Sequence, residues 1–170
     1  MSSLYAPPAA VRPARADDAG AVRAIRNDAV ETTTAIWTSV PMSEDEARSW
    51  VSDLAGRNAM LVAEVDGDVV GYASFSPWRA KEGYRHSVED SVYVAPGQQG
   101  NGVGRALLTE LVATARDAGA HRMYADIEAG NAASISLHES LGFRRVGLLR
   151  EVGTKFGRWL DLAILELELA

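Results

Sequence analysis

Residues 89–105 constrain the fold of this chain more than any other segment, because they predict a strand, a glycine-rich loop and the start of a helix in direct succession. The strand ends at Pro96, since proline cannot donate to a sheet ladder. From Val103 onward, apolar side chains recur on one helical face until Gly119, a residue that suits the left-handed position after a helix. A loop at a helix N-terminus offers unpaired N–H groups and the positive end of the helix dipole. The segment therefore predicts a phosphate-binding site.

Two common phosphate-binding patterns fit this segment poorly. A P-loop needs a Lys and a Ser or Thr directly after its last glycine, but Gly104 is followed by Arg105 and Ala106. A dinucleotide-binding fingerprint needs three glycines directly after the strand and an acidic residue about 20 positions on. Asp126 and Glu128 lie near that distance, but the third glycine is missing. A nucleoside triphosphatase and a dinucleotide-binding protein are both disfavoured.

Length and composition predict one domain with a sizeable core, since the chain has 170 residues of which 47% are hydrophobic. We expect residues 1–10 to be a loose, flexible N-terminal tail and residues 11–170 to form the domain. The chain has no apolar run of about 20 residues, and its start does not resemble a signal peptide. We therefore expect a cytoplasmic protein without a membrane partner.

Charge and residue types narrow the chemistry further. The formal net charge of −6 disfavours nucleic acid as a partner. The chain has no cysteine, which excludes a thiolate metal site and an acyl-cysteine mechanism. His86, His121 and His138 lack metal-ligand spacing, so we expect no metal.

The order of predicted elements indicates a mixed α/β (α+β) domain. A short strand at residues 11–14 precedes a helix that Asp17 can cap, and a capping box formed by Ser43 and Glu46 begins a second helix. The Asp-Gly turn at residues 66–67 predicts a hairpin of residues 60–65 and 69–75. Beyond the central helix, residues 122–128, 143–151 and 159–169 predict strands, and a short helix runs from Asn131 to Gly142.

Two sequence patterns resemble a known family. Gln99-x-x-Gly102-x-Gly104 after a Val-Tyr-Val strand resembles the acetyl-CoA signature of GNAT-type N-acetyltransferases. Asn131-x-x-Ser134-x-x-x-His138-x-x-x-Gly142-Phe143 can be explained as helix caps, but it resembles the same family. His138 stands where many members have Tyr. Together with residues 88–94 and 155–161, it is similar to the branch of phosphinothricin and methionine sulfoximine N-acetyltransferases.

The resemblance covers residues 11–169 and implies a fold, a co-substrate and an assembly. It implies the GNAT acyl-CoA N-acyltransferase fold, a largely antiparallel twisted sheet flanked by helices. It also implies that acetyl-CoA binds with its pyrophosphate on the loop amides and its pantetheine arm along the strand, and that the protein is a homodimer. The residues that it assigns to acetyl-CoA are Val92, Tyr93, Val94, Gln99, Gly100, Asn101, Gly102, Val103, Gly104, Arg105, Asn131 and Ser140.

Acetyl transfer to an amine needs two proton steps. The amine is protonated near neutral pH, so a base must remove a proton before nitrogen attacks the thioester. We predict Glu89 as this base, although it can also be an exposed carboxylate at a strand end. Asp90 points to the opposite face by strand alternation and is the weaker candidate. A backbone N–H of residues 92–94 is expected to stabilise the oxyanion, and His138 either protonates the thiolate, belongs to the base relay or only packs on its helix.

The acceptor site is predicted from the loop before Glu89. This loop concentrates cations and aromatics that can hold an anionic group and enclose an aliphatic chain. Resemblance nominates methionine sulfoximine, methionine sulfone and phosphinothricin as acceptors. The alternatives are a non-catalytic sensor of CoA or an amino acid, and a protein or peptide N-acetyltransferase. The residues that we assign to the acceptor are Trp78, Arg79, Ala80, Lys81, Tyr84, Arg85, Glu89, Asp90 and Ser91, with Trp159 beside the aliphatic chain.

One further segment has two interpretations. Residues 32–37 lie between the first two predicted helices. They are either a connector whose Ile36 and Trp37 cover the core or a wall of the substrate pocket.

Overall fold

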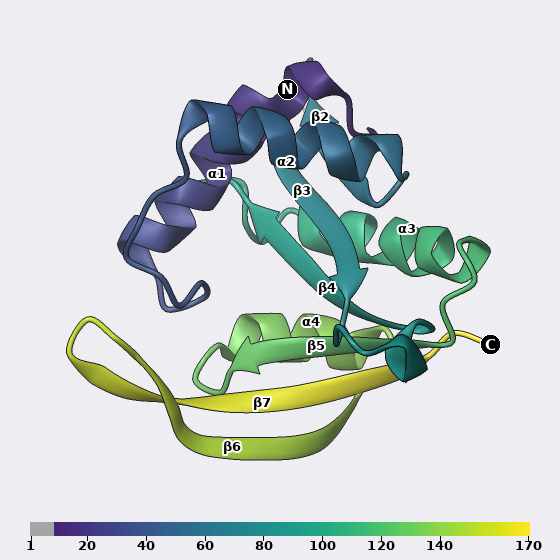
Figure 1. Cartoon of the computed structure of the whole chain (residues 1–170). Helices are drawn as coiled ribbons and strands as arrows, with labels where there is room; N and C mark the ends of the chain where they lie inside the picture. Colours follow the sequence, from purple (N-terminus) through teal and green to yellow (C-terminus); the bar gives the residue numbers. More distant parts are fainter. Residues whose placement is uncertain (1–8) are drawn as a thin grey trace, which may run out of the picture.

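Across the residues that the structure describes, one open sheet of seven strands organises the protein, in the order β1-β2-β3-β4-β5-β7-β6 (Figure 1). A computed structural model describes residues 9–170. Every neighbouring pair of strands is antiparallel except β4 and β5, which are parallel. The strands are β1 Ala10–Pro13, β2 Met60–Val65, β3 Asp68–Pro77, β4 Ser87–Val94, β5 Arg122–Glu128, β6 Arg144–Lys155 and β7 Arg158–Glu168.

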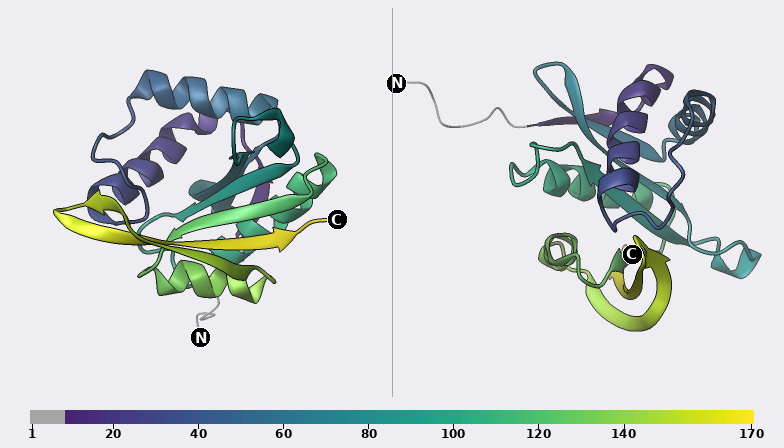
Figure 2. Two further views of the ribbon diagram at one scale, coloured as in Figure 1. Left: turned by 60° about the horizontal axis from the view of Figure 1, so that its bottom comes forward. Right: turned by 90° about the vertical axis from the view of Figure 1, so that its left-hand side faces the viewer.

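Four α-helices flank the sheet: α1 Ala19–Thr32, α2 Glu44–Gly56, α3 Val103–Asp117 and α4 Ala132–Ser140. Helices α1 and α2 pack together on one face of the sheet, whereas α3 covers the other face and α4 lies beside β5 (Figure 2). Short 3-10 helices occupy Ala16–Asp18 and Glu82–Tyr84. Across residues 9–170, no helix combines the length and the apolar character that crossing a membrane requires.

Local sequence signals account for most element boundaries. The capping box is present, because the Ser43 hydroxyl accepts from the Glu46 N–H at 3.2 Å and Glu46 accepts from the Ser43 N–H at 2.8 Å. The predicted hairpin turn has positive φ angles at Asp66 and Gly67, 53° and 88°. Gly119 also has a positive φ angle, 87°, after α3 as predicted.

Two predictions at the N-terminal end need correction. The N-cap residue of helix α1 is Asp18 and not Asp17, because a 3-10 turn precedes the helix. Asp18 is buried, and its carboxylate lies 2.8 Å from the Arg12 guanidinium. The expected tail covers residues 1–10, of which residues 1–8 lie outside the described residues. Ala10 begins β1 and pairs with Glu64, so the first strand starts one residue earlier than predicted.

The core has two parts, one on each face of the sheet. Leu107, Leu108 and Leu111 of α3 are fully buried against the first face, as the helical spacing predicts. Val22 and Ile25 of α1 pack with α2 against the second face. Burial on both faces fixes the positions of the strands that carry the site.

The sheet divides where β4 meets β5. Their pairing covers Ser87–Glu89 on β4 and Arg122–Tyr124 on β5. Beyond Glu89, β4 continues to pair with β3 as far as Val94, while β5 stays paired with β7 as far as Glu128. Within the described chain, the edge of β4 that faces β5 is therefore free of strand partners past this fork, and the sheet opens into a V (Figure 1).

Candidate active site

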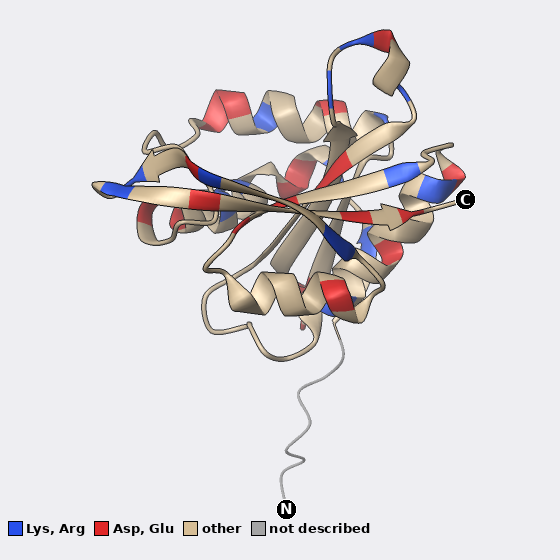
Figure 3. Cartoon of the chain, turned by 90° about the horizontal axis from the view of Figure 1, so that it is seen from below, with Lys and Arg blue, Asp and Glu red and all other residues tan. Residues whose placement is uncertain are grey.

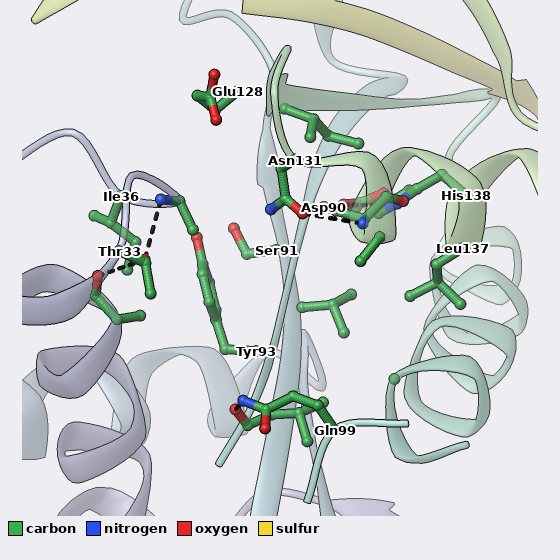
Figure 4. A pocket seen from close by; sticks show the side chains of 18 of the residues that line it. Thr33, Ile36, Asp90, Ser91, Tyr93, Gln99, Glu128, Asn131, Leu137 and His138 are labelled. Carbon is green, nitrogen blue, oxygen red and sulfur yellow. Dashed lines mark hydrogen bonds and ion pairs between the residues drawn. The ribbon is translucent and has the colours of Figure 1, made fainter. Parts of the chain in front are cut away.

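A cavity of about 680 Å³ occupies the opening of the V. Its walls come from β4, β5, the end of α1, α4 and the loop before α3 (Figure 4). Glu89 lies at the fork itself, where it is the last β4 residue paired with β5. The predicted site residues that line the cavity are Glu89, Asp90, Ser91, Val92, Tyr93, Val94, Gln99, Gly100, Gly102, Gly104, Arg105, Asn131 and His138.

Strand β4 presents two chemically different faces to this cavity. Ser91 and Tyr93 point toward α1, whereas Asp90 points toward His138 on α4 (Figure 4). Val92 and Val94 pack with the core beneath α3. The alternation predicted for Glu89 and Asp90 is therefore present. Both side chains line the cavity, because β5 diverges from β4 beyond Glu89.

Glu89 has the electrostatic properties of a base that works near neutral pH. Burial raises the pKa of this carboxyl to about 7, the nearby Asp126 and Asp90 add to the increase, and Arg79 opposes it. Burial also raises the pKa of Asp126. Asp126 Oδ1 is buried and has no hydrogen-bond partner within residues 9–170. The two carboxyl groups therefore form an acidic region that favours a cation.

His138 and Asp90 form a buried pair on the other side of β4. His138 Nε2 lies 3.2 Å from Asp90 Oδ1, and the two residues are 2% and 7% exposed. His138 Nδ1 lies 2.7 Å from the carbonyl oxygen of Ser134, which can only accept, so Nδ1 carries a proton. Burial lowers the pKa of His138, but the hydrogen bond and charge of Asp90 outweigh it and raise the pKa overall. Asp90 thus holds the imidazole in place.

The glycine-rich loop has the conformation that its sequence predicts. Gly100 and Gly102 have φ angles of 79° and 80°, and Gly102 directly precedes α3. A Cβ on Gly104 would lie 3.3 Å from the Leu137 side chain, so glycine there leaves the backbone accessible from the cavity. Gln99 stabilises the loop, since its side chain accepts from the Gly97 N–H at 3.0 Å and donates to the Val94 carbonyl at 3.3 Å.

Three of the residues that we assigned to acetyl-CoA are absent from the described cavity lining. Val103 is 3% exposed and belongs to the core. Ser140 accepts a hydrogen bond from Arg105 at 2.8 Å and donates to the Leu137 carbonyl at 2.6 Å. Within the described cavity lining, neither of these residues nor Asn101 appears. Ser140 therefore supports Arg105, and Val103 anchors the start of α3.

Most of the predicted acceptor loop lies away from the cavity. The segment between β3 and β4 projects from the body of the protein and carries charges of both signs (Figures 2 and 3). Arg85 lines a separate hollow of about 330 Å³ with His86. The described cavity lining includes none of the predicted residues of this loop, which are Trp78, Arg79, Ala80, Lys81, Tyr84 and Arg85. The sequence could not reveal this because the direction of the loop depends on the length of β3, which extends to Pro77.

Arg79 and Trp78 are the part of this loop that stays close to the site. The charge of Arg79 acts on both Glu89 and Asp126. Trp78 stacks on Tyr124 of β5 with ring centroids 4.2 Å apart, and Arg79 lies 4.6 Å from the Trp78 ring. Trp159, which we expected beside the aliphatic chain, is instead 68% exposed at the start of β7.

Sequence reasoning missed several residues that the fold brings to the cavity. Asp126 and Glu128 lie two residues apart on β5, so they share one face of the strand. In the sequence they were weighed only as the acidic residue of a dinucleotide-binding fingerprint. Glu128 accepts from the Thr34 hydroxyl at 3.2 Å. The segment after α1 forms a wall of this cavity through Thr33, Ala35, Ile36 and Trp37, which favours the second of its two interpretations. Alternating polar residues on β5 were the available signal, but strand pairing decides which site they face.

The fold and this cavity define a class of enzyme. The chain matches the acetyltransferase (GNAT) family over residues 22–143, and it belongs to that family. The predictions of a GNAT fold and of an N-acetyltransferase are confirmed.

Three similar proteins define the branch more closely. The chain is 49% identical over 161 residues to the L-amino acid N-acyltransferase MnaT of Escherichia coli, covering 94% of this chain and 93% of that protein. It is 46% identical to the L-methionine sulfoximine/L-methionine sulfone acetyltransferase of Pseudomonas aeruginosa, covering 95% of each. A crystal structure of a phosphinothricin acetyltransferase from Sinorhizobium meliloti in complex with acetyl-CoA matches with a TM-score of 0.91 at 38% identity, covering 95% of this chain and 89% of that one.

Proposed function

We propose that this protein transfers an acetyl group from acetyl-CoA to the α-amino group of a small amino-acid analogue. The observation that carries this proposal is the pairing of opposite charges at the fork. Glu89 and Asp126 favour the ammonium group of an acceptor, and Arg79 acts on the same region and can hold its carboxylate. Relatives that act on L-amino acids and on methionine sulfoximine support the same acceptor class.

Acetyl-CoA fits the residues on the opposite side of the cavity. The loop at Gly100 and Gly102 leads directly into the N-terminus of α3. Backbone N–H groups at a helix N-terminus favour a phosphate, and Arg105 adds a positive charge. The free edge of β4 can pair with the amide groups of the pantetheine arm as a neighbouring strand would. When bound, acetyl-CoA supplies the acetyl group as a thioester. The acetyl-CoA complex of the Sinorhizobium meliloti relative agrees with this assignment.

The roles of individual residues follow from their positions. Glu89 accepts the proton that the ammonium must lose, because a pKa of about 7 leaves it partly ionised at neutral pH. A backbone N–H on the free edge of β4 can donate to the oxygen on which negative charge develops. His138 is our candidate donor to the departing thiolate. The Ser134 carbonyl holds its Nδ1 proton, so the proton that would be transferred is the one on Nε2, which faces Asp90.

We propose that the protein acts as a homodimer. Of the eight exposed large hydrophobic residues in the range 9–170, six lie on the β6–β7 hairpin: Val146, Leu148, Leu149, Val152, Phe156 and Trp159. Strand β6 is also an edge of the sheet, so it presents unpaired backbone groups beside these side chains. A second copy of this hairpin would cover both. A cytoplasmic location and a role in detoxifying such analogues are further parts of the proposal.

The acceptor is tested with four compounds in an assay that measures thiol release from acetyl-CoA. Methionine sulfoximine and methionine sulfone should have much higher kcat/KM values than methionine, because a site that binds a polar group rejects an analogue lacking it by more than about 10³-fold. Phosphinothricin should rank below them, since one nearby arginine must hold two anionic groups. Equal values for methionine and its sulfone would contradict the proposal. Activity on peptides alone would favour a protein N-acetyltransferase, and acetyl-CoA binding without turnover a sensor.

A further inference from the structure

Lys155, the last residue of β6, makes an unusual set of contacts with the end of α1. Its side chain is buried, and the residue is 6% exposed. Lys155 Nζ donates to the carbonyl oxygens of Val30, Thr33 and Ile36, each at 2.6 Å. In Figures 1 and 2, the tip of the β6–β7 hairpin lies beside the end of α1 and the loop that follows it.

This arrangement satisfies the hydrogen-bonding groups of both Lys155 and the end of α1. An ammonium group has three donors, and here all three have acceptors. The last carbonyl groups of a helix lack partners within the helix and carry its negative dipole end, so a buried cation is favourable there. Arginine would fit less well, because its planar guanidinium does not direct three donors at converging carbonyls. Lys155 therefore caps α1 from a strand 125 residues away in sequence.

The capped segment is also the wall of the cavity. Thr33 and Ile36, whose carbonyls Lys155 binds, both line the cavity. Trp37 lines it too, and the indole N–H donates to the Thr34 carbonyl at 2.9 Å. The same indole lies directly against Gly153 of β6, where an added Cβ would overlap the ring. The hairpin thus contacts the wall at two points, through a side chain and through a glycine backbone.

The other side of this wall faces the carboxylates of β5. The Thr34 hydroxyl donates to Glu128 at 3.2 Å, and Glu128 lies two residues beyond Asp126 on the same face of the strand. A shift of the wall would therefore move groups beside the proposed acceptor. The glycine-rich loop for acetyl-CoA is held by separate contacts, from Gln99 to its neighbours and from Arg105 to Ser140.

We propose that the tip of the β6–β7 hairpin positions the acceptor-side wall of the active site, with Lys155 and Gly153 as the positioning residues. This inference rests on the function proposed above in one respect, the assignment of this wall to the acceptor. Lys155 does not act on the reacting atoms. It fixes the conformation of residues 33–37 so that the amine is held in line with the thioester.

The experiment combines hydrogen exchange with steady-state kinetics. Lys155→Met keeps the length of the side chain and removes the three donors. Gly153→Ala leaves Lys155 intact and displaces Trp37. Arg158→Met is the control, because Arg158 pairs with Lys155 across the hairpin and is exposed. The acceptor in the kinetic assay is methionine sulfone.

In both test variants, the backbone amide hydrogens of residues 33–37 should exchange with solvent about tenfold faster than in wild type, or more, as expected when a local segment is released. Their kcat/KM for the acceptor should fall by about 10-fold to 10²-fold, with KM for acetyl-CoA within about twofold of wild type. Arg158→Met should match wild type in each measurement. Activity of either variant at saturating acceptor would show that it is folded.

Two results would overturn the inference. Unchanged exchange in residues 33–37 would show that the hairpin does not hold the wall, and this readout needs no acetylation activity. Equal losses for acceptor and acetyl-CoA would show a general effect on the fold. If Lys155→Met fails to fold, Gly153→Ala alone decides, since an unchanged kcat/KM for the acceptor in that variant contradicts the proposal. Failure of wild type to acetylate any amine would instead reject the proposed function.

Discussion

At the scale of single residues, the position of Glu89 predicts how activity depends on pH. A base with a pKa of about 7 must be ionised to act, so kcat/KM should rise with pH through an apparent pKa near that value. Glu89→Gln should lower kcat by about 10²-fold or more and remove this rise, with little effect on acetyl-CoA binding. Thiol release measured between pH 5.5 and 8.5, in steps of about half a unit, tests both effects. An unchanged kcat would reject Glu89 as the base.

The same substitution should stabilise the protein at alkaline pH. The pKa of Glu89 is about 7 in the folded state against an ordinary value of 4.5, so the folded state binds more protons between these values. Stability is therefore lost as pH rises from 4.5 to 7. Glu89→Gln should melt at a higher temperature than wild type at pH 8, and this gain should disappear below pH 4.5. The result would separate lost catalysis from lost folding.

His138 should stay protonated to a higher pH than an ordinary histidine. Nδ1 carries a proton because it faces a carbonyl, and Asp90 favours a second proton on Nε2. The pKa of His138 is raised, so the stability contributed by its charge is present below pH 6.5 and is lost as pH rises through the folded pKa. Nitrogen-15 NMR of the ring should give a titration midpoint above the ordinary value of 6.5, and Asp90→Asn should lower that midpoint. A midpoint at or below 6.5 would contradict this prediction.

At the scale of elements, the junction of β4, the loop and α3 carries the proposed acetyl-CoA site. Gly102 has a φ angle of 80°, and a side chain at Gly104 would meet Leu137. Gly102→Val and Gly104→Val together should weaken acetyl-CoA binding by more than about tenfold, since left-handed strain alone costs about 1–3 kcal/mol. Isothermal titration calorimetry measures this affinity. Gly83→Ala is a suitable control, because Gly83 has open space around its Cα position. An unchanged affinity would show that phosphate binds elsewhere.

At the scale of the whole molecule, the exposed hairpin predicts self-association. Leu148→Glu together with Trp159→Glu should convert a dimer to a monomer in sedimentation velocity, because each places a charge among the exposed apolar side chains of the hairpin. Val40→Glu provides the control, since Val40 is also exposed but lies outside the hairpin. A monomeric wild type at micromolar concentration would contradict the homodimer.

Element boundaries followed from the sequence because they depend on local interactions. The Ser43–Glu46 capping box, the Asp66-Gly67 turn and the Asn131 cap of α4 each involve residues within a few positions of one another. The glycine spacing before α3 likewise predicted a loop that leaves backbone accessible. These patterns, together with Glu89 and His138 near the loop, were enough to predict the family and a candidate base.

The composition of the proposed acceptor site depended on tertiary structure. Asp126 and Glu128 join Glu89 only because β5 is parallel to β4 for three residue pairs and then diverges. The charged loop at residues 78–86 is close to Glu89 in sequence, yet most of it projects away from the cavity. Lys155 reaches α1 across 125 residues, a contact that no local pattern encodes. Register and strand divergence set these positions, and both arise from packing on the two faces of the sheet rather than from neighbouring residues.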